Sequence, residues 1–263
     1  MKTDIAIVVP VCGQHQLTND LLSDLGRYAH NTFIVDNGGD YVPPATGPEI
    51  LRPGMNLGWA RGCNYGIRLA RTYNPGHFLL INNDVRLSRE FIVGLLDAAL
   101  TSGAAVVGPI YDHNWPHQRG KYRGPAGEYK PREIERSVPF IDGTAMLIEA
   151  SWLDDGIDSD TWPRFGWGCD KDFCLRVRGR DGKVVVTERS YLNHIGRATV
   201  RMDPWFSEAA AELENNEGMH KKYGPHWEDI LYSGFPDLVR NGDSQDRLNP
   251  VSSARQNYID LAP

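Results

Sequence analysis

The chain has 263 residues and a net charge of −6, with 41% hydrophobic and 24% charged residues. This length suits one large domain, with or without an appendage, and the composition excludes an intrinsically disordered chain. No long basic block is present, so the sequence does not indicate a nucleic-acid binder, which has to neutralise many phosphates.

Apolar runs and amphipathic segments alternate through the first half of the chain. We predict strands at 4–10, 32–37, 49–52, 77–84, 104–110 and 138–149, and helices at 16–28, 56–72, 88–103 and within 165–182. Ser88 is expected to cap the third helix and Gly103 to end it. Alternation at this spacing predicts an α/β fold with a largely parallel sheet and helices on both faces.

The remaining segments are less regular. Residues 111–137 are polar and rich in Gly and Pro, which is typical of a surface loop, either a solvated connection or a substrate-facing lid. KVVVTE and SYLNHIG predict two short strands. We divide the chain into a domain at 1–203 and a helical extension and tail at 204–263, which either packs on the substrate side or mediates self-association in a homo-oligomer.

The sequence predicts no transmembrane segment, because the apolar run at the N-terminus is too short and lacks a signal-peptide layout. The four cysteines form no CxxC pair, so we expect a reduced, cytoplasmic setting and no zinc site. A peripheral position at a membrane stays open.

The stretch LLINNDV (79–85) ends an apolar strand on Asn82, Asn83 and Asp84. In open α/β sheets, ligands gather beyond the carboxyl ends of the strands, where Asp36 is also expected. A carboxylate there can hold Mg²⁺ or Mn²⁺ together with phosphate oxygens. A metal-bound diphosphate is therefore one interpretation, and a polar strand end in a turn is the other.

Three further stretches carry candidate chemistry. In NLGWARGCN (56–64), Gly58 and Gly62 allow close backbone approach and Arg61 offers a fork to phosphate, although an exposed turn explains this stretch equally well. In GWGCDKDFCLR (166–176), Asp170 opens a helix and is either a general base or a helix cap. The remaining candidates in these stretches are Trp167, Asp172 and, in YLNHIG, the histidine His194, which could join Asp84 on a metal.

Taken in order, these pieces resemble the family-2 glycosyltransferases of the GT-A fold, most closely the rhamnosyl- and galactofuranosyl-transferase-like branch. The motifs that carry the resemblance are IAIVVPVCG, FIVDNGG, NLGWARGCNYGI, FLLINNDV, FIDGTAMLI, FGWGCDKDFCLR and YLNHIG, across roughly residues 4–196. One motif would be weak, whereas seven in order are specific. The resemblance implies a Rossmann-like central sheet and an inverting, metal-assisted transferase of hexosyltransferase type.

The resemblance also implies roles for single residues. Pro10 and Asp36 would line the nucleoside pocket, and the nucleotide and its diphosphate would lie along Asn56, Gly58, Arg61 and Asn64. Asn82, Asn83 and Asp84 stand at the family's DXD motif, with Asp84 and His194 on the metal. Asp170 matches the general base, and the donor-sugar or acceptor side would be lined by Gly143, Trp167, Gly168 and Asp172.

Two positions depart from the family's pattern. Asn82 replaces the first acid of DXD, so the Mn²⁺ or Mg²⁺ ion is expected to bind mainly together with the nucleotide. Cys169 replaces the first acid of the later pattern, which puts the usual acceptor contacts in doubt but keeps the base.

Two other classes of protein remain as alternatives. A sugar nucleotidyltransferase would show a basic, glycine-rich loop after the first strand, where this chain reads PVCGQHQ. A non-catalytic binder of nucleotide-sugars or glycans is disfavoured by the retained Asp84, Asp170 and His194. The expected partners of the enzyme are a nucleotide-sugar donor and a glycan, lipid-linked or protein acceptor, and no nucleic acid.

Overall fold

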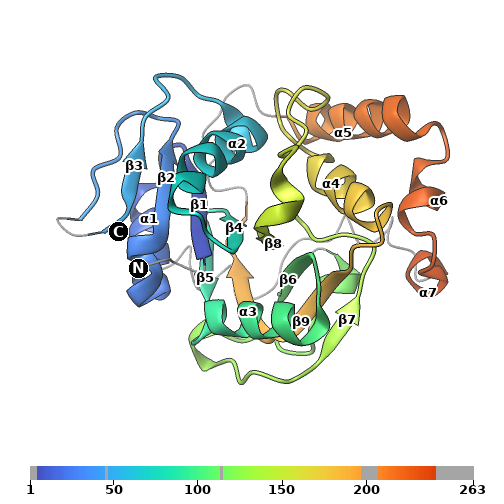
Figure 1. The fold of residues 1–263 in the computed structure, drawn as a ribbon, viewed down its shortest axis with the longest axis horizontal. Helices are drawn as coiled ribbons and strands as arrows, with labels where there is room; N and C mark the ends of the chain where they lie inside the picture. Colours follow the sequence, from blue (N-terminus) through green and yellow to red (C-terminus); the bar gives the residue numbers. More distant parts are fainter. Residues whose placement is uncertain (1–4, 45–46, 113–114, 197–206, 241–263) are drawn as a thin grey trace.

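A mixed sheet covered by helices runs through the computed structural model, which describes residues 5–44, 47–112, 115–196 and 207–240 (Figure 1). The strands are β1 (Ile5–Val11), β2 (Thr32–Asp36), β3 (Glu49–Leu51), β4 (His77–Ile81), β5 (Val85–Leu87), β6 (Val106–Tyr111), β7 (Glu135–Ser137), β8 (Ala145–Glu149) and β9 (Val184–His194). The α-helices are α1 (His15–Leu25), α2 (Gly58–Ala70), α3 (Phe91–Ser102), α4 (Cys169–Arg178), α5 (Glu208–Tyr223), α6 (Trp227–Leu231) and α7 (Pro236–Arg240).

The described strands form one nine-stranded sheet in the order β3-β2-β1-β4-β8-β6-β9-β5, with β7 paired to β9. β1 is parallel to both β2 and β4, β2 is parallel to β3, and β6 is parallel to β9. β8 is antiparallel to β4 and β6, while β5 and β7 are antiparallel to β9. The antiparallel β8 starts where β4 ends, so the segment before β8 reaches the same sheet edge as the residues after β4.

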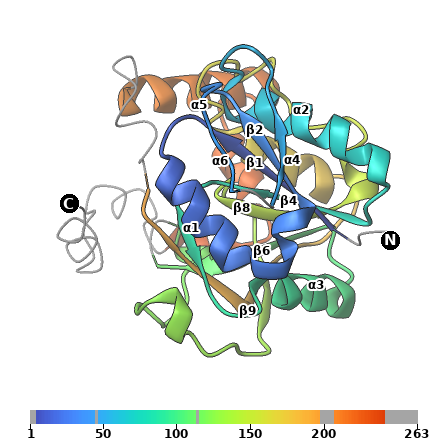
Figure 2. The ribbon, with the colours of Figure 1, turned by 90° about the vertical axis from the view of Figure 1, so that its left-hand side faces the viewer.

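Helices cover both faces of the sheet, as the sequence predicts (Figure 2). Side chains alternate along β1, with Ile7 on the face packed by α1 and α3 and Val8 on the face packed by α2 and α4. A Cβ added at Gly66 of α2 would stand 2.5 Å from Cγ1 of Val8. Gly66 therefore lets α2 lie close to the strand whose end opens the site.

Several predicted boundaries differ from the structure. Gly103 ends α3 in the left-handed conformation, as predicted, but Ser88 does not cap this helix, because its Oγ accepts a hydrogen bond from the Tyr191 amide. The two short strands predicted after residue 182 are one strand, β9. The strand predicted at 138–149 is only Ala145–Glu149, because a turn precedes it.

The C-terminal helices lie beside α4, at the opposite end of the molecule from α1 (Figure 1). Residues 112–134 are mostly irregular where they are described, with two short 3-10 segments, η3 (Pro116–Gln118) and η4 (Ala126–Glu128). No helix in the described ranges is both long and apolar enough to cross a membrane.

Candidate functional site

The site begins where the parallel strands end at one edge of the sheet. The turn before α2 reaches this edge, since the Asn37 amide group, just after β2, bonds the backbone N–H of Leu57 (3.1 Å) and the carbonyl of Gly58 (3.3 Å). From the first turn of α2, the indole Nε1 of Trp59 donates to Oδ1 of Asn82, at the end of β4, over 2.9 Å. Two of the predicted motifs therefore meet directly.

Gly143 joins the same edge from the turn before β8. The backbone N–H of Asn82 donates to the carbonyl of Thr144 (2.9 Å), which places this turn against the end of β4. A Cβ at Gly143 would stand 3.1 Å from the Trp59 ring and 3.7 Å from Oδ2 of Asp170. The glycine therefore leaves room between an aromatic wall and the predicted base.

Asp84 and His194 face each other across the β5–β9 pairing. Val85 is opposite His194 in the antiparallel register, and Asp84 Oδ1 lies 3.4 Å from His194 Nε2. Both side chains are largely buried, at 8% and 12% exposure. Burial works against a charged imidazole, but Asp84, followed in the size of their effect by Asp142 and Asp112, raises the pKa of His194 above its ordinary value.

Asp112 and Asp142 were not among the residues predicted from the sequence. Asp112 follows β6 and accepts from the Asn193 side chain (3.1 Å) and the His194 amide (3.3 Å). Asp142 precedes Gly143 and accepts from the indole of Trp115 (2.7 Å). Each is an acid directly after an apolar run, and this pattern could have identified both.

Asp170 lies in the first turn of α4, and Gly168, in a positive-φ conformation, precedes the helix. Its Oδ2 accepts from the Gly143 amide (3.0 Å) and its Oδ1 from the Lys171 amide (2.8 Å). Burial, followed by the nearby Asp142 carboxylate, raises the pKa of Asp170 to about 6. A partly exposed carboxylate with a pKa close to neutral has the properties of a general base.

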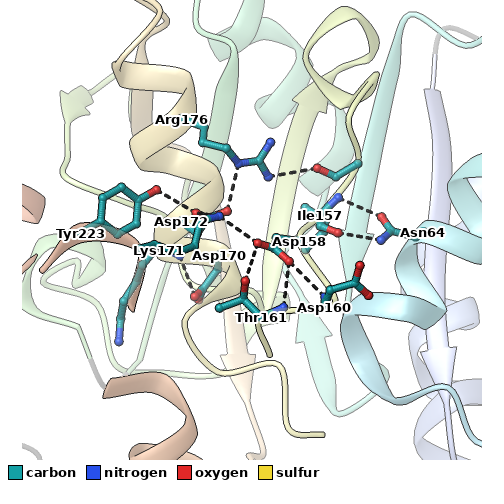
Figure 3. Close-up of polar contacts among 12 residues, drawn as sticks. Asn64, Ile157, Asp158, Asp160, Thr161, Asp170, Lys171, Asp172, Arg176 and Tyr223 are labelled. Carbon is teal, nitrogen blue, oxygen red and sulfur yellow. Dashed lines mark hydrogen bonds and ion pairs between the residues drawn. The ribbon is translucent and has the colours of Figure 1, made fainter. Parts of the chain in front are cut away.

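Asp172, two residues further on, has a different environment (Figure 3). Asp172 is fully buried. Its carboxylate accepts hydrogen bonds from the Tyr223 hydroxyl (2.7 Å) and from Nε of Arg176 (2.9 Å), and it forms an ion pair with the Lys222 ammonium (2.5 Å). Lys222 also binds Asp158. Although burial opposes it, the hydrogen bonds from Lys222 and Thr161 hold the pKa of Asp158 below its usual range. Asp172 thus joins α4 to α5 and the 156–161 loop.

Other predicted residues also make contacts within the protein. Asn83 is buried and donates to the Thr18 hydroxyl of α1 (3.0 Å), away from Trp59. Asn64 binds both the amide and the carbonyl of Ile157, at 2.9 and 2.7 Å (Figure 3). Arg61 lies 3.8 Å from the exposed carboxylate of Asp160. These side chains hold α1, α2 and the 156–161 loop in place.

The nucleoside side of the prediction lies at the ends of β1 and β2. Pro10 packs against α2, 3.3 Å from a Cβ placed on Gly62. Asp36 is buried and accepts from the amides of Gly39 (2.8 Å) and Tyr41 (3.1 Å), which shapes the loop after β2. Asn56 accepts from the Gly58 amide, its Oδ1 lying 2.8 Å from that nitrogen.

The donor set at Asp84 and His194 fits a divalent cation held by few protein groups. A carboxylate oxygen and an imidazole nitrogen already face each other, and Mg²⁺ and Mn²⁺ commonly use one or two protein ligands plus phosphate oxygens. In the part of the chain that the structure describes, no group of three or more His, Cys, Asp or Glu side chains could hold a metal alone. The remaining ligands would have to come from a nucleotide and from water.

Comparison with solved structures identifies the fold. The structure of GalNAc-T7 with UDP, GalNAc and Mn²⁺ aligns with 98% of this chain at a TM-score of 0.62 and 11% identity, and the alignment spans 54% of that longer chain. Residues 1–349 of TarS from S. aureus align with 92% of this chain at a TM-score of 0.52 and 12% identity, over 80% of that chain. The protein therefore has the GT-A glycosyltransferase fold, as predicted.

Sequence comparison gives the closer relationship. The chain is 41% identical over 198 residues to the uncharacterized protein Rv1525 of Mycobacterium tuberculosis, and equally to Mb1552 of Mycobacterium bovis. The match covers 74% of this chain and 75% of those proteins. The chain belongs to the same family as these mycobacterial proteins. No protein-family model matches it.

Proposed function

We propose that the protein is an inverting glycosyltransferase that moves a sugar from a nucleoside-diphosphate donor to an acceptor hydroxyl. The observation that supports this most is Asp170, a carboxylate with a raised pKa, held beside Gly143 at the strand ends of a GT-A fold. The finer assignment to the rhamnosyl- and galactofuranosyl-transferase-like branch of family 2 is part of the proposal and rests on the sequence resemblance.

Asp170 acts as the general base in this mechanism. With a pKa of about 6, it is mostly ionised at neutral pH and accepts the proton of the acceptor hydroxyl as that oxygen attacks the anomeric carbon. The Gly143 and Lys171 amides orient the two carboxylate oxygens. The bond to the departing diphosphate breaks on the opposite face of the sugar, which inverts the anomeric configuration.

The donor is bound at the ends of β1, β2 and β4. The proposed nucleotide contacts come from the turn that Asn37 holds in place before α2, with Asn56, Gly58 and Arg61, and from Asn82. Asp84 and His194 would hold the cation, and bound there it would offset the negative charge that grows on the diphosphate. Trp59 forms the wall on which the donor sugar rests.

Thermal stabilisation by nucleotides tests the donor site. We would measure Tm with UDP, GDP and dTDP, each with and without Mn²⁺, for the native protein and for Asp84→Asn, with the exposed Glu217→Gln as control. One nucleotide should raise Tm strongly, mainly with Mn²⁺, and Asp84→Asn should remove the metal-dependent part. If no nucleotide at millimolar concentration shifts Tm, the donor site is wrong.

Transfer itself separates an enzyme from a binding protein. With the donor class chosen by the stabilising nucleotide, a panel of glycan and lipid-linked acceptors would be analysed for products by mass spectrometry. Nucleotide binding without release of nucleoside diphosphate from any donor and acceptor pair would favour a non-catalytic binder over the proposed transferase.

A further inference from the structure

Three consecutive charged residues at the start of α4 point to three different places. Asp170 contacts Gly143, and Asp172 joins the α5 network. Lys171, between them, is only 7% exposed. A buried ammonium beside the proposed base has no place in the mechanism described above, and lysine is among the residues least often buried.

The Lys171 ammonium lies among aromatic rings from three separate segments. It is 5.2 Å from the ring centre of Trp115 in the loop before η3, 5.8 Å from that of Phe140 and 5.6 Å from that of Trp227 in α6. Oδ1 of Asn215, a buried residue of α5, is 3.1 Å from Nζ. Rings attract a cation through their faces, so these groups hold the charge in one position.

The rings of Trp115, Phe140 and Trp227 form an aromatic cage around Lys171, and Trp115 links this cage to the site. One face of its indole meets Lys171, while its Nε1 donates to Oδ2 of Asp142 over 2.7 Å. Asp142 is the carboxylate that, after burial, contributes most to the raised pKa of Asp170. Lys171 acts in the opposite direction on the same carboxyl. The cage therefore holds a positive charge that counteracts the negative charge of two acids, Asp142 and Asp170.

Several titratable groups that interact electrostatically with Lys171, Asp142 or Asp170 are neutral at pH 7. They are Tyr111, His117, Cys169 and Cys174. Burial raises the pKa of Tyr111 and of both cysteine thiols, and it lowers the pKa of His117 to about 4. Glu212 of α5 lies one hydrogen bond further away, through Asn215. Lys171 is the cation that lowers the pKa of Asp170, whereas His194, whose pKa is raised, interacts with Asp142.

We propose that Lys171 is a positioning residue that keeps Asp170 ionised, and that α5 and α6 support the base by holding this ammonium in its aromatic cage. The proposal deepens the function proposed above and rests on it. It also gives the C-terminal helices a part in the chemistry, because Asn215 and Trp227 both belong to them.

Titration of Asp170 by carbon-13 NMR of its carboxyl carbon tests the proposal without any substrate. Asp170→Asn assigns the resonance, and the midpoint is then compared between the native protein and Lys171→Met, which keeps the length of the side chain and favourable ring contacts without the charge. The midpoint should rise by on the order of 1 pH unit. Lys171→Arg should stay close to the native midpoint, as should Lys221→Met, an exposed control on α5.

A midpoint in Lys171→Met within a few tenths of a unit of the native value would overturn the proposal. If that variant does not fold, Lys171→Gln, which still donates to Asn215, is titrated instead with the same expectation. If the native protein shows no transfer with any donor and acceptor, the proposed function is contradicted, but this titration stays valid. The two proposals can therefore fail separately.

Where transfer is measurable, the pH profile is a second readout. With a native pKa of about 6 and a variant value about 1 unit higher, Lys171→Met should lower the rate roughly fivefold at pH 6 and hardly at all at pH 8. A merely structural role would lower the rate equally at both pH values, and that result would contradict the proposal.

Discussion

Two groups of acids in this protein differ in the partners of their carboxylates, which are neutral donors in one group and cations in the other. At the strand ends, Asp142 and Asp170 accept hydrogen bonds from neutral donors, the Trp115 indole and the Gly143 and Lys171 amides. Around α5, Asp158 and Asp172 are paired with the side-chain cations Lys222 and Arg176.

The difference shows how a structural acid can be told from one that is available for chemistry. Asp172 has its charge balanced inside the protein, so it stabilises the packing of α4 against α5 and has little capacity left for a substrate. Burial, followed by repulsion from Asp142, raises the pKa of Asp170 to about 6, a value suited to accepting a proton near neutral pH. The resemblance made Asp170 the base and placed Asp172 on the donor-sugar or acceptor side, whereas the structure pairs the Asp172 carboxylate with Lys222 and Arg176.

Asp170→Asn should have the largest effect on activity. Removing a general base typically lowers the rate on the order of 10²–10⁴-fold, while the amide can still accept from the Gly143 N–H. The variant should keep nucleotide-dependent stabilisation, measured by Tm, and lose transfer, measured by product formation. Transfer at the native rate would show that Asp170 is not the base.

Asp172→Asn should act on stability in the first place. Removing one partner of a buried ion-pair network leaves Lys222 and Arg176 without their shared carboxylate, and we expect a loss of about 3 kcal/mol in the free energy of unfolding. Urea denaturation measures this, with Glu217→Gln, an exposed acid of α5, as control. A change no larger than that of the control would mean that the network does not hold α5.

Glu214→Gln tests a smaller link between α5 and the site. The Glu214 carboxylate accepts from three consecutive amides, those of Arg164 (2.8 Å), Phe165 (2.8 Å) and Gly166 (3.2 Å). An amide side chain accepts more weakly, so stability should fall by about 1.5 kcal/mol. The three backbone amides should also exchange hydrogen faster, and unchanged exchange there would contradict the assignment.

Gly143→Ala should have the smallest effect. The added methyl group would stand 3.1 Å from the Trp59 ring, which has to move by a few tenths of an ångström. We expect the transition state to lose roughly 1 kcal/mol of stabilisation, which lowers kcat/KM about fivefold. Gly127→Ala, where an added Cβ meets nothing within 4 Å, is the matched control. Equal activity of the two variants would separate Gly143 from the proposed site.

The sequence by itself determined the fold class and most of the elements. Buried strands such as β1 and β4 are continuous apolar runs, and α1 shows one apolar helical face, so these elements follow from local periodicity. Polar residues after apolar runs also indicated the site edge, because the parallel strands β1, β2 and β4 all end there. Asn82 and Asp84 were predicted in this way, whereas Asp170 was predicted from its place at a helix start and Gly143 from the family resemblance.

Tertiary structure alone decided what each acid contacts. Asp170 and Asp172 occupy the same helical turn, yet side chains two positions apart on a helix do not share a face, so one meets Gly143 and the other meets Lys222. The partners Trp115, Asn215, Lys222 and Trp227 are tens of residues away from α4 in the chain. Electrostatic environment depends on such long-range contacts, and no local pattern contains them.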